Sequence, residues 1–255
     1  MLIKNRIICL LTLIIIIGIQ PVISQESFTK KGTMNIGFET GIQFSGISDP
    51  YMPISDNGIG YAAGPFFEYY LNDIIKFRGG LQYDSRAFSL GDGGYIDDSN
   101  YYAKSSYYDV TQKYHVNYLT IPLSLIYTKG SDKFNFFIQG TLYYSMFLSS
   151  NQSGDFHIFI SEEDAPHYDF EGYPEFNIPG DHYLEIEGKD QFSTSDIGIN
   201  LLFGATYYIK PNLGITLSPG FSYSFANVWE DPLRKTTWAN IYKINIGIIY
   251  TLNKK

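Results

Sequence analysis

The chain has 255 residues, of which 44% are hydrophobic and 17% aromatic, and its 23 Tyr and 19 Phe favour β-strands over helices. This composition excludes a disordered chain, and the length suits one large β domain or two small ones. The 26 Asp and Glu exceed the 18 Lys and Arg. Nucleic acid is therefore not an expected partner, because phosphate binding requires a basic face.

The N-terminus predicts a secretory signal peptide over residues 1–24. Two basic residues precede an apolar run over 7–19, and VIS at 22–24 has residues of suitable size for a cleavage site. An uncleaved membrane anchor is the alternative, but the run is short for a spanning helix. We expect cleavage after Ser24, which leaves a domain of residues 25–255.

Cleavage would remove Lys4, Arg6 and the only cysteine, Cys9. The remaining chain then has 16 basic and 26 acidic residues and a net charge of −10. It also has no thiol with which to form a disulfide or a cysteine metal site.

Eight segments alternate bulky apolar residues with small or polar ones, which is the period of a β-strand. In 213–225, LGITLSPGFSYSF, the large residues take every odd position and Gly, Thr and Ser every even one. The eight segments are 34–45, 59–71, 74–88, 114–127, 133–148, 193–208, 213–225 and 237–252.

The connections between these segments alternate in length. Three are brief, namely NDI, TKGSDK and KPN, whereas the other four run over about 46–58, 89–113, 149–192 and 226–236. Short turns at one end and long loops at the other are typical of outer-membrane barrels. The sequence predicts an all-β fold, an eight-stranded antiparallel up-and-down transmembrane β-barrel with long extracellular loops.

The volume of such a barrel indicates which face is inside. Eight strands leave an interior only just wide enough for side chains, and eight rows of Leu, Ile, Phe and Tyr would overfill it. The apolar rows should therefore face lipid. A soluble barrel of the lipocalin type is the alternative, but it would expose an aromatic skin to water. Residues that suit an interfacial girdle are Tyr127, Tyr207, Tyr250 and Trp238.

Four acidic and four basic residues occupy the inward positions. We expect them to pair across the lumen, because a lone charge in a poorly hydrated interior is costly. A salt-bridged plug is the favoured interpretation, and a proton or ion path is the alternative. The eight residues are Glu39, Glu68, Lys76, Arg78, Asp84, Arg86, Asp196 and Lys243. Pro65, Pro122 and Pro219 each predict a bulge or a kink.

Four stretches resemble the PorT-type outer-membrane barrels common in Bacteroidota. They are GPFFEYYLNDIIKFRGGLQY (64–83), VNYLTIPLSLIYTKG (116–130), STSDIGINLLFGATYYI (193–209) and the closing WANIYKINIGIIYTL. The resemblance implies an outer-membrane location and insertion by the barrel assembly machinery. Leu252 stands where an aromatic residue often ends such barrels. In this family the function is mostly unassigned, although the namesake is linked to protein secretion and gliding. The resemblance therefore implies location more strongly than activity.

The long loops carry the candidate functional residues. Residues 150–190 contain many acids, and SEEDAPHYDFEG (161–172) offers ligands for Ca²⁺ bridging to lipopolysaccharide phosphates, although its spacing favours a solvated acidic loop. Five tyrosines in 89–113 are suited to stacking on sugars or docking a partner protein, or they extend a hairpin and pack on one another. These are Tyr95, Tyr101, Tyr102, Tyr107 and Tyr108.

A rim enzyme has little support. The four histidines His115, His157, His167 and His182 lie near the outer rim without a motif spacing, so we expect no catalytic, cofactor or metal residues. We expect a structural or interaction scaffold whose acidic and Tyr-rich loops bind a protein, a glycan or lipopolysaccharide, in a secretion or surface apparatus. A narrow channel is the main alternative.

Overall fold

The computed structural model describes residues 31–48, 54–98, 101–164, 178–188, 192–226 and 238–252. The predicted signal peptide, residues 1–24, lies outside these ranges. Within them, no helix combines the length and the apolar character needed to cross a bilayer.

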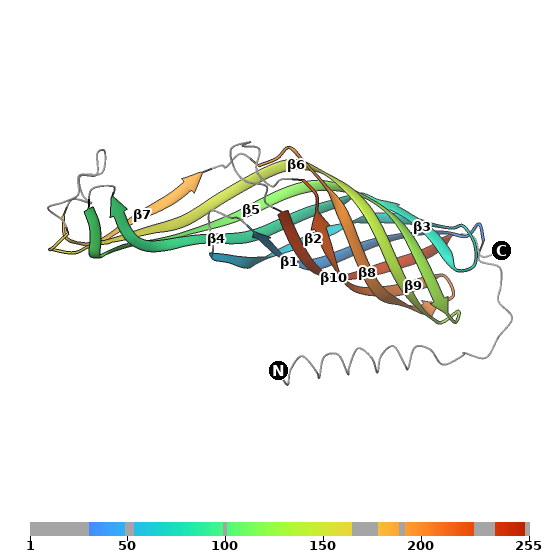
Figure 1. Cartoon of the computed structure of the whole chain (residues 1–255). Helices are drawn as coiled ribbons and strands as arrows, with labels where there is room; N and C mark the ends of the chain where they lie inside the picture. The colour runs from blue at the N-terminus through green and yellow to red at the C-terminus, as the bar shows by residue number, and fades with distance from the viewer. Residues whose placement is uncertain are drawn as a thin grey trace, which may run out of the picture.

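Antiparallel strands make up the fold, and they curve around a common axis (Figure 1). They are β1 (Met34–Ser48), β2 (Ile54–Tyr70), β3 (Ile75–Gly80), β4 (Gln82–Asp98), β5 (Tyr101–Gly130), β6 (Phe134–Ile160), β7 (Gly180–Gly188), β8 (Ser195–Lys210), β9 (Leu213–Ser224) and β10 (Trp238–Leu252). The first strand pairs with the last from Met34 opposite Leu252 to Ser48 opposite Trp238, which closes the sheet into a ring.

The ring has eight strands, as the alternation predicts. β3 and β4 are two parts of one barrel strand, since both lie between β2 and β5. β7 pairs with the outer part of β6, beyond the part that pairs with β8, so it lies outside the ring. The eight-stranded antiparallel barrel is therefore confirmed.

Two prolines explain why β3 and β4 are separate. The Leu81 N–H donates to the Pro65 carbonyl at 3.1 Å, so the backbone of Leu81 faces β2 and that of Gly80 faces β5. The register places Gly80 opposite Pro122. Because proline has no N–H, one ladder bond is missing on each side of this point.

Of the two alternatives expected at each proline, a bulge or a kink, the bulge is wrong. The registers shift at Asn57/Tyr61, Tyr95/Asp97, Asn117/Tyr118 and Tyr208/Lys210, none of which is at a proline. Pro65 and Pro219 keep their register opposite Phe38 and Ile244. The reason is that a missing donor removes one bond without adding a residue, whereas a bulge requires an extra residue.

The two faces of the barrel are arranged as the volume argument predicts. Along β6 the even positions from Phe134 to Met146 are exposed and the odd positions between them are buried. Leu123 and Leu125 on β5 and Ile246 and Ile248 on β10 are likewise exposed. The girdle residues Tyr127, Tyr207 and Tyr250 lie on this outer face at the short-turn end, while the side chain of Trp238 is outside the described set.

The lumen also contains large rings, which the volume argument did not anticipate. Several of them lie directly opposite a glycine on the adjacent strand: Phe66 opposite Gly37, Tyr143 opposite Gly198, and Phe137 opposite Gly204. A Cβ at any of these three glycines would clash with the facing ring. Glycines therefore provide the space in which an eight-stranded barrel holds inward aromatic rings.

Three strands continue far beyond the ring at the end opposite the short turns (Figure 1). The projecting sheet comprises residues 89–98 of β4, 101–115 of β5, 150–160 of β6, and β7. The expectation of loops over 89–113 and 149–192 is thus wrong for much of both segments. Cross-strand pairing of β4 with β5 continues beyond the ring, and the hairpin interpretation of 89–113 is confirmed.

Candidate functional site: the lumen and the projecting sheet

Glu68 is the centre of one lumenal cluster, with 0% of its surface exposed. Lys76 Nζ donates to Glu68 Oε2 at 2.8 Å, and Arg78 Nη2 donates to Oε1 at 2.7 Å. Arg78 also donates from Nη1 to Glu39 at 3.0 Å and lies over the ring of Phe66, 4.1 Å from its centroid. Two carboxylates and two cations thus balance one another across three strands.

Arg86 organises a second cluster nearer the outer end. Its Nη2 donates to Asp84 at 2.9 Å and its Nη1 to Asp196 at 2.5 Å, so the guanidinium connects β4 to β8 on the other side of the lumen. The Tyr143 hydroxyl donates to Asp196 at 3.1 Å, and Arg86 lies 4.6 Å from the ring centroid of Tyr118. This cluster crosses the barrel interior.

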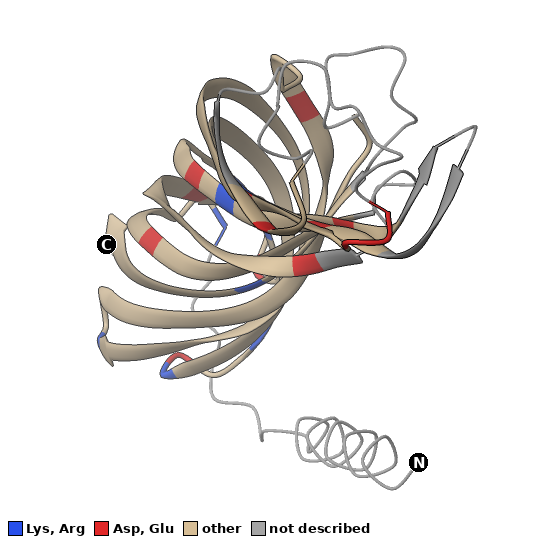
Figure 2. Ribbon diagram, turned by 90° about the vertical axis from the view of Figure 1, so that its left-hand side faces the viewer, with Lys and Arg blue, Asp and Glu red and all other residues tan. Residues whose placement is uncertain are grey.

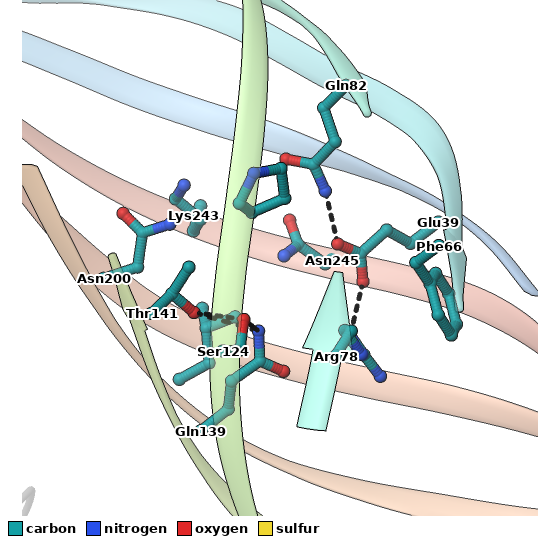
Figure 3. A pocket seen from close by; sticks show the side chains of 12 residues that line it. Glu39, Phe66, Arg78, Gln82, Ser124, Gln139, Thr141, Asn200, Lys243 and Asn245 are labelled. Carbon is teal, nitrogen blue, oxygen red and sulfur yellow. Dashed lines mark hydrogen bonds and ion pairs between the residues drawn. The ribbon is translucent and has the colours of Figure 1, made fainter. Parts of the chain in front are cut away.

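Lys243 is the eighth lumenal charge, and it is buried without an ion pair among the described residues. It lines a cavity of about 10 Å³ together with Asn200 and Gln139 (Figure 3). The side-chain oxygens of these two amides have no hydrogen-bond partner among the described residues. The volume admits about one water molecule.

An apolar cluster closes the outer end of the lumen. Phe192, which is buried, lies edge-on to Phe88 and Tyr114 at centroid distances of 6.1 and 5.7 Å, and it stacks near Phe147 at 6.4 Å. The cluster also contains Ile47, Leu90, Val116, Tyr118 and Ala239. The outer end of the lumen, above the two charged clusters, therefore contains packed apolar side chains.

All eight inward charges predicted from the sequence are buried. Seven of them form ion pairs, and Lys243 is the exception within the described part of the chain. The expected pairing of charges across the lumen is thus confirmed for these seven residues. Such an arrangement crosslinks the strands of the barrel through ion pairs.

The projecting sheet carries a row of aromatic side chains on its outer face, which we call the aromatic ridge: Tyr95, Tyr107, His157, Phe159 and Tyr183. Tyr95 pairs with Tyr107, Tyr107 with Phe159, and His157 with Tyr183. The Tyr107 and Phe159 rings stack at 5.4 Å and the His157 and Tyr183 rings at 4.6 Å. The ridge thus crosses four strands.

Asp and Glu occur on several strands of the sheet (Figure 2), and two of them, Asp109 and Asp181, neighbour ridge residues in the register. Asp109 lies beside His157 in the register, and His157 Nε2 is 2.9 Å from Asp181 Oδ1. On the other face, Tyr108 donates to Asp92 at 3.1 Å, and this hydrogen bond raises the pKa of the Tyr108 hydroxyl. The surface therefore combines exposed rings with carboxylates.

The structure does not assemble the other loop candidates into a site. His182 contacts the Ile178 carbonyl oxygen, His115 is exposed, and His167 lies outside the described residues. Asp164 accepts hydrogen bonds from Ser106 and Ser161 and anchors the end of β6. No group of three metal-ligating side chains occurs within the described ranges, and much of the proposed Ca²⁺ stretch falls outside them.

Sequence reasoning missed Phe192, Phe159 and Tyr183. Tyr183 and Phe159 belong to segments with alternating residues, so a period-two pattern inside the acidic segment was the available signal. Phe192 carries no such signal. Only the curvature of the barrel brings it over Phe88 and Tyr114.

Three solved structures illustrate the similarity to known proteins. Neisserial surface protein A (NspA) is 13% identical, with 85% of this chain and 97% of that chain covered and a TM-score of 0.40. OprG from Pseudomonas aeruginosa is 11% identical, with coverage of 88% and 97% and a TM-score of 0.39. A major outer membrane protein from Thermus thermophilus is 15% identical, with coverage of 86% and 99% and a TM-score of 0.40.

The search of curated protein sequences found no significant match. The comparison with protein families matched residues 23–230 to the family described as "Outer membrane protein beta-barrel domain". This match covers the barrel from before β1 through β9 and the projecting sheet. The chain belongs to the outer membrane protein beta-barrel domain family.

Proposed function

We propose that this integral outer-membrane barrel is an interaction scaffold, in which the projecting sheet binds a partner at the cell surface. The observation that carries the proposal is the contrast between the two ends of the barrel. The short-turn end has tight connections, whereas the other end holds a sheet with exposed rings and carboxylates well beyond the ring of strands. Building this sheet requires about 50 residues that barrel closure does not need.

The finer parts of the proposal rest on resemblance and chemistry. The resemblance of the stretches at 64–83 and 116–130 supports a PorT-type protein of Bacteroidota, and with it a partner in a secretion or surface apparatus. The partner is a protein, a glycan or lipopolysaccharide. We also infer that residues 1–24 direct export and are cleaved, and that the barrel assembly machinery inserts the chain.

A binding role is better supported than a channel or an enzyme. Two charged clusters and the Phe192 cluster fill the lumen, which disfavours conduction. Among the described histidines, His157 contacts Asp181 but no nucleophilic hydroxyl, and catalysis needs an assembled group of that kind. We therefore propose that the chain is not an enzyme and needs no cofactor.

The experiment that tests the proposal removes the outer part of the sheet without opening the barrel. Gln152 and Gly188 are cross-strand neighbours, so residues 153–187 can be replaced by an Asn-Gly turn that joins them. A photo-crosslinker at position 183 of the full chain should capture a surface component from intact cells. A crosslinker at Asp132, in the turn at the opposite end, is the control.

The expected result is capture at position 183 but not at 132, with loss of cell-surface partner binding in the trimmed variant. The trimmed chain should still show the faster migration of a folded barrel on unboiled gels. Equal capture at both positions, or undiminished binding by the trimmed chain, would contradict the proposal. Steady currents from the purified wild-type protein in planar bilayers would favour the channel instead.

A further inference from the structure

The outer face of the projecting sheet is an unpartnered surface in the described residues. Tyr95 has 60% of its surface exposed, Tyr107 40% and Tyr183 73%. Water-exposed rings in a row across four strands form a patch of the kind that marks a binding surface rather than a solvated hairpin. The rings are also held in place by stacking, so little side-chain entropy is lost when a ligand binds.

The charge of the projecting sheet selects a cationic ligand. Over its residues, 89–98, 101–115, 150–160 and 180–188, the chain has eight Asp and Glu against two Lys, a formal charge of −6. The whole chain has a formal charge of −8, so negative charge is concentrated here. A polyanion such as a lipopolysaccharide core would be repelled, whereas Lys and Arg would be attracted at long range.

The cross-strand register places carboxylates within reach of the same cation as the rings. Asp181 lies in the row of Tyr107 and Phe159, and Asp109 in the row of His157 and Tyr183. A Lys or Arg side chain above a tyrosine gains a cation–π interaction and, with a neighbouring carboxylate, an ion pair. A neutral sugar would use the rings but not the charge.

The free edge of the sheet, at β7, is the third feature that supports binding of a ligand. β7 ends the strand order and, among the described residues, pairs only with β6. A further strand can add to an edge of this kind through main-chain hydrogen bonds. Alternate side chains of that strand would then lie on the ridge face beside Tyr183 and Asp181.

We propose that the ridge and the β7 edge bind an extended, basic segment of a partner protein, with Lys or Arg at alternate positions. This inference rests on the proposed function and names the class of partner for the same surface. The rings supply cation–π contacts, the carboxylates supply charge, and the edge fixes the direction of the bound segment. A lipid or a glycan has no peptide backbone with which to form the main-chain hydrogen bonds of an added strand at the β7 edge.

The test uses the full-length mature protein in nanodiscs and a fluorescent peptide of about ten alternating Lys and Thr residues, monitored by anisotropy. Saturable binding that weakens when NaCl rises from about 50 to about 500 mM is expected. Tyr183→Ser should weaken binding about two- to fivefold, and Tyr107→Ser with Tyr183→Ser about tenfold. Asp181→Asn should weaken binding, whereas Asp132→Asn, which removes the same charge at the opposite end, should not.

A second peptide separates strand addition from simple charge attraction. It has the same Lys content but carries Pro in place of Thr, so it cannot donate main-chain hydrogen bonds at those positions. Binding at least about tenfold weaker than that of the Lys-Thr peptide is expected, and equal binding would overturn strand addition. Binding of a neutral polysaccharide or of lipopolysaccharide, without binding of the Lys-Thr peptide, would overturn the inference.

The two proposals fail in different ways. If crosslinked capture depends on residues 153–187 while the basic peptide does not bind, the scaffold function stands and the basic partner is wrong. If neither capture nor peptide binding depends on this sheet, both proposals fall.

Discussion

At the scale of single residues, the lumen is organised by two kinds of contact. Ion pairs hold buried charges, as Glu68 does with Lys76 and Arg78. Glycines face the inward rings, as Gly204 faces Phe137. Each contact joins particular side chains. A single substitution at one of these residues should therefore change the free energy of unfolding strongly.

Neutralising Glu68 should be strongly destabilising. Glu68→Gln breaks the ion pair with Lys76 and one of the two that Arg78 makes, and an uncompensated buried charge costs about 3–5 kcal/mol. The measurement is urea unfolding in lipid vesicles, followed by tryptophan fluorescence.

The double variant Glu68→Gln, Lys76→Met provides the control for this experiment. It restores charge balance, because Arg78 keeps its 3.0 Å pair with Glu39. Its loss of unfolding free energy should be smaller than the sum of the two single losses. Strict additivity would mean that the ion pair is not what stabilises this cluster.

Two glycines of the barrel should respond in opposite ways to the same substitution. A Cβ at Gly204 would overlap the Phe137 ring and the Leu217 carbonyl, whereas a Cβ at the outward Gly140 would have no atom within 4 Å. Gly204→Ala should lower the free energy of unfolding by about 1–3 kcal/mol. Gly140→Ala should be neutral or raise it by up to about 1 kcal/mol. The same urea titration compares them, and similar losses at both sites would refute the pairing argument.

At the scale of one element, β5 shows how a single strand passes through two environments. Its outward residues from Leu119 to Tyr127 form the apolar band, and beyond Asn117 the outward positions are polar until the aromatic ridge begins at Tyr107. The band spans nine residues, which matches the length of a tilted transmembrane strand. The outward residues of β5 therefore face lipid in one half of the strand and water in the other half.

A charge should be costly in the band and harmless above it. Leu123→Arg places a guanidinium at the middle of the band and should cost about 2–4 kcal/mol of unfolding free energy in vesicles. His115→Arg, on the same face of the same strand, should change it by less than about 0.5 kcal/mol. If Leu123→Arg were as mild as His115→Arg, this face would not contact hydrocarbon.

At the scale of the whole molecule, the pairing that closes the ring of strands and the packing that fills the lumen involve different contacts. The β1–β10 pairing closes the barrel along the full length of both strands. The lumen holds two layers of packed side chains, the Phe192 cluster at the outer end and the ion-paired clusters below it. Because two layers of side chains fill the lumen, we predict that removal of one layer does not open a conducting path.

Phe192→Ala should therefore destabilise the protein without opening it. Loss of a buried ring costs about 3–5 kcal/mol at most, while Arg86 still connects Asp84 to Asp196 across the lumen. Planar-bilayer recordings of the variant should match those of the wild type. A steady open-state current from this single substitution would show that the Phe192 cluster is the only barrier.

The sequence by itself determined the number of barrel strands, the face that meets lipid and the set of lumenal charges. The reason is that a strand's two faces repeat every two residues, and a slim barrel has a fixed interior volume. The tertiary structure alone decided which charges pair, because Arg86 and Asp196 are 110 positions apart and meet only once the ring closes. It also decided that the acidic segments continue as strands, since pairing of β7 with β6 depends on a neighbour that no single segment reveals.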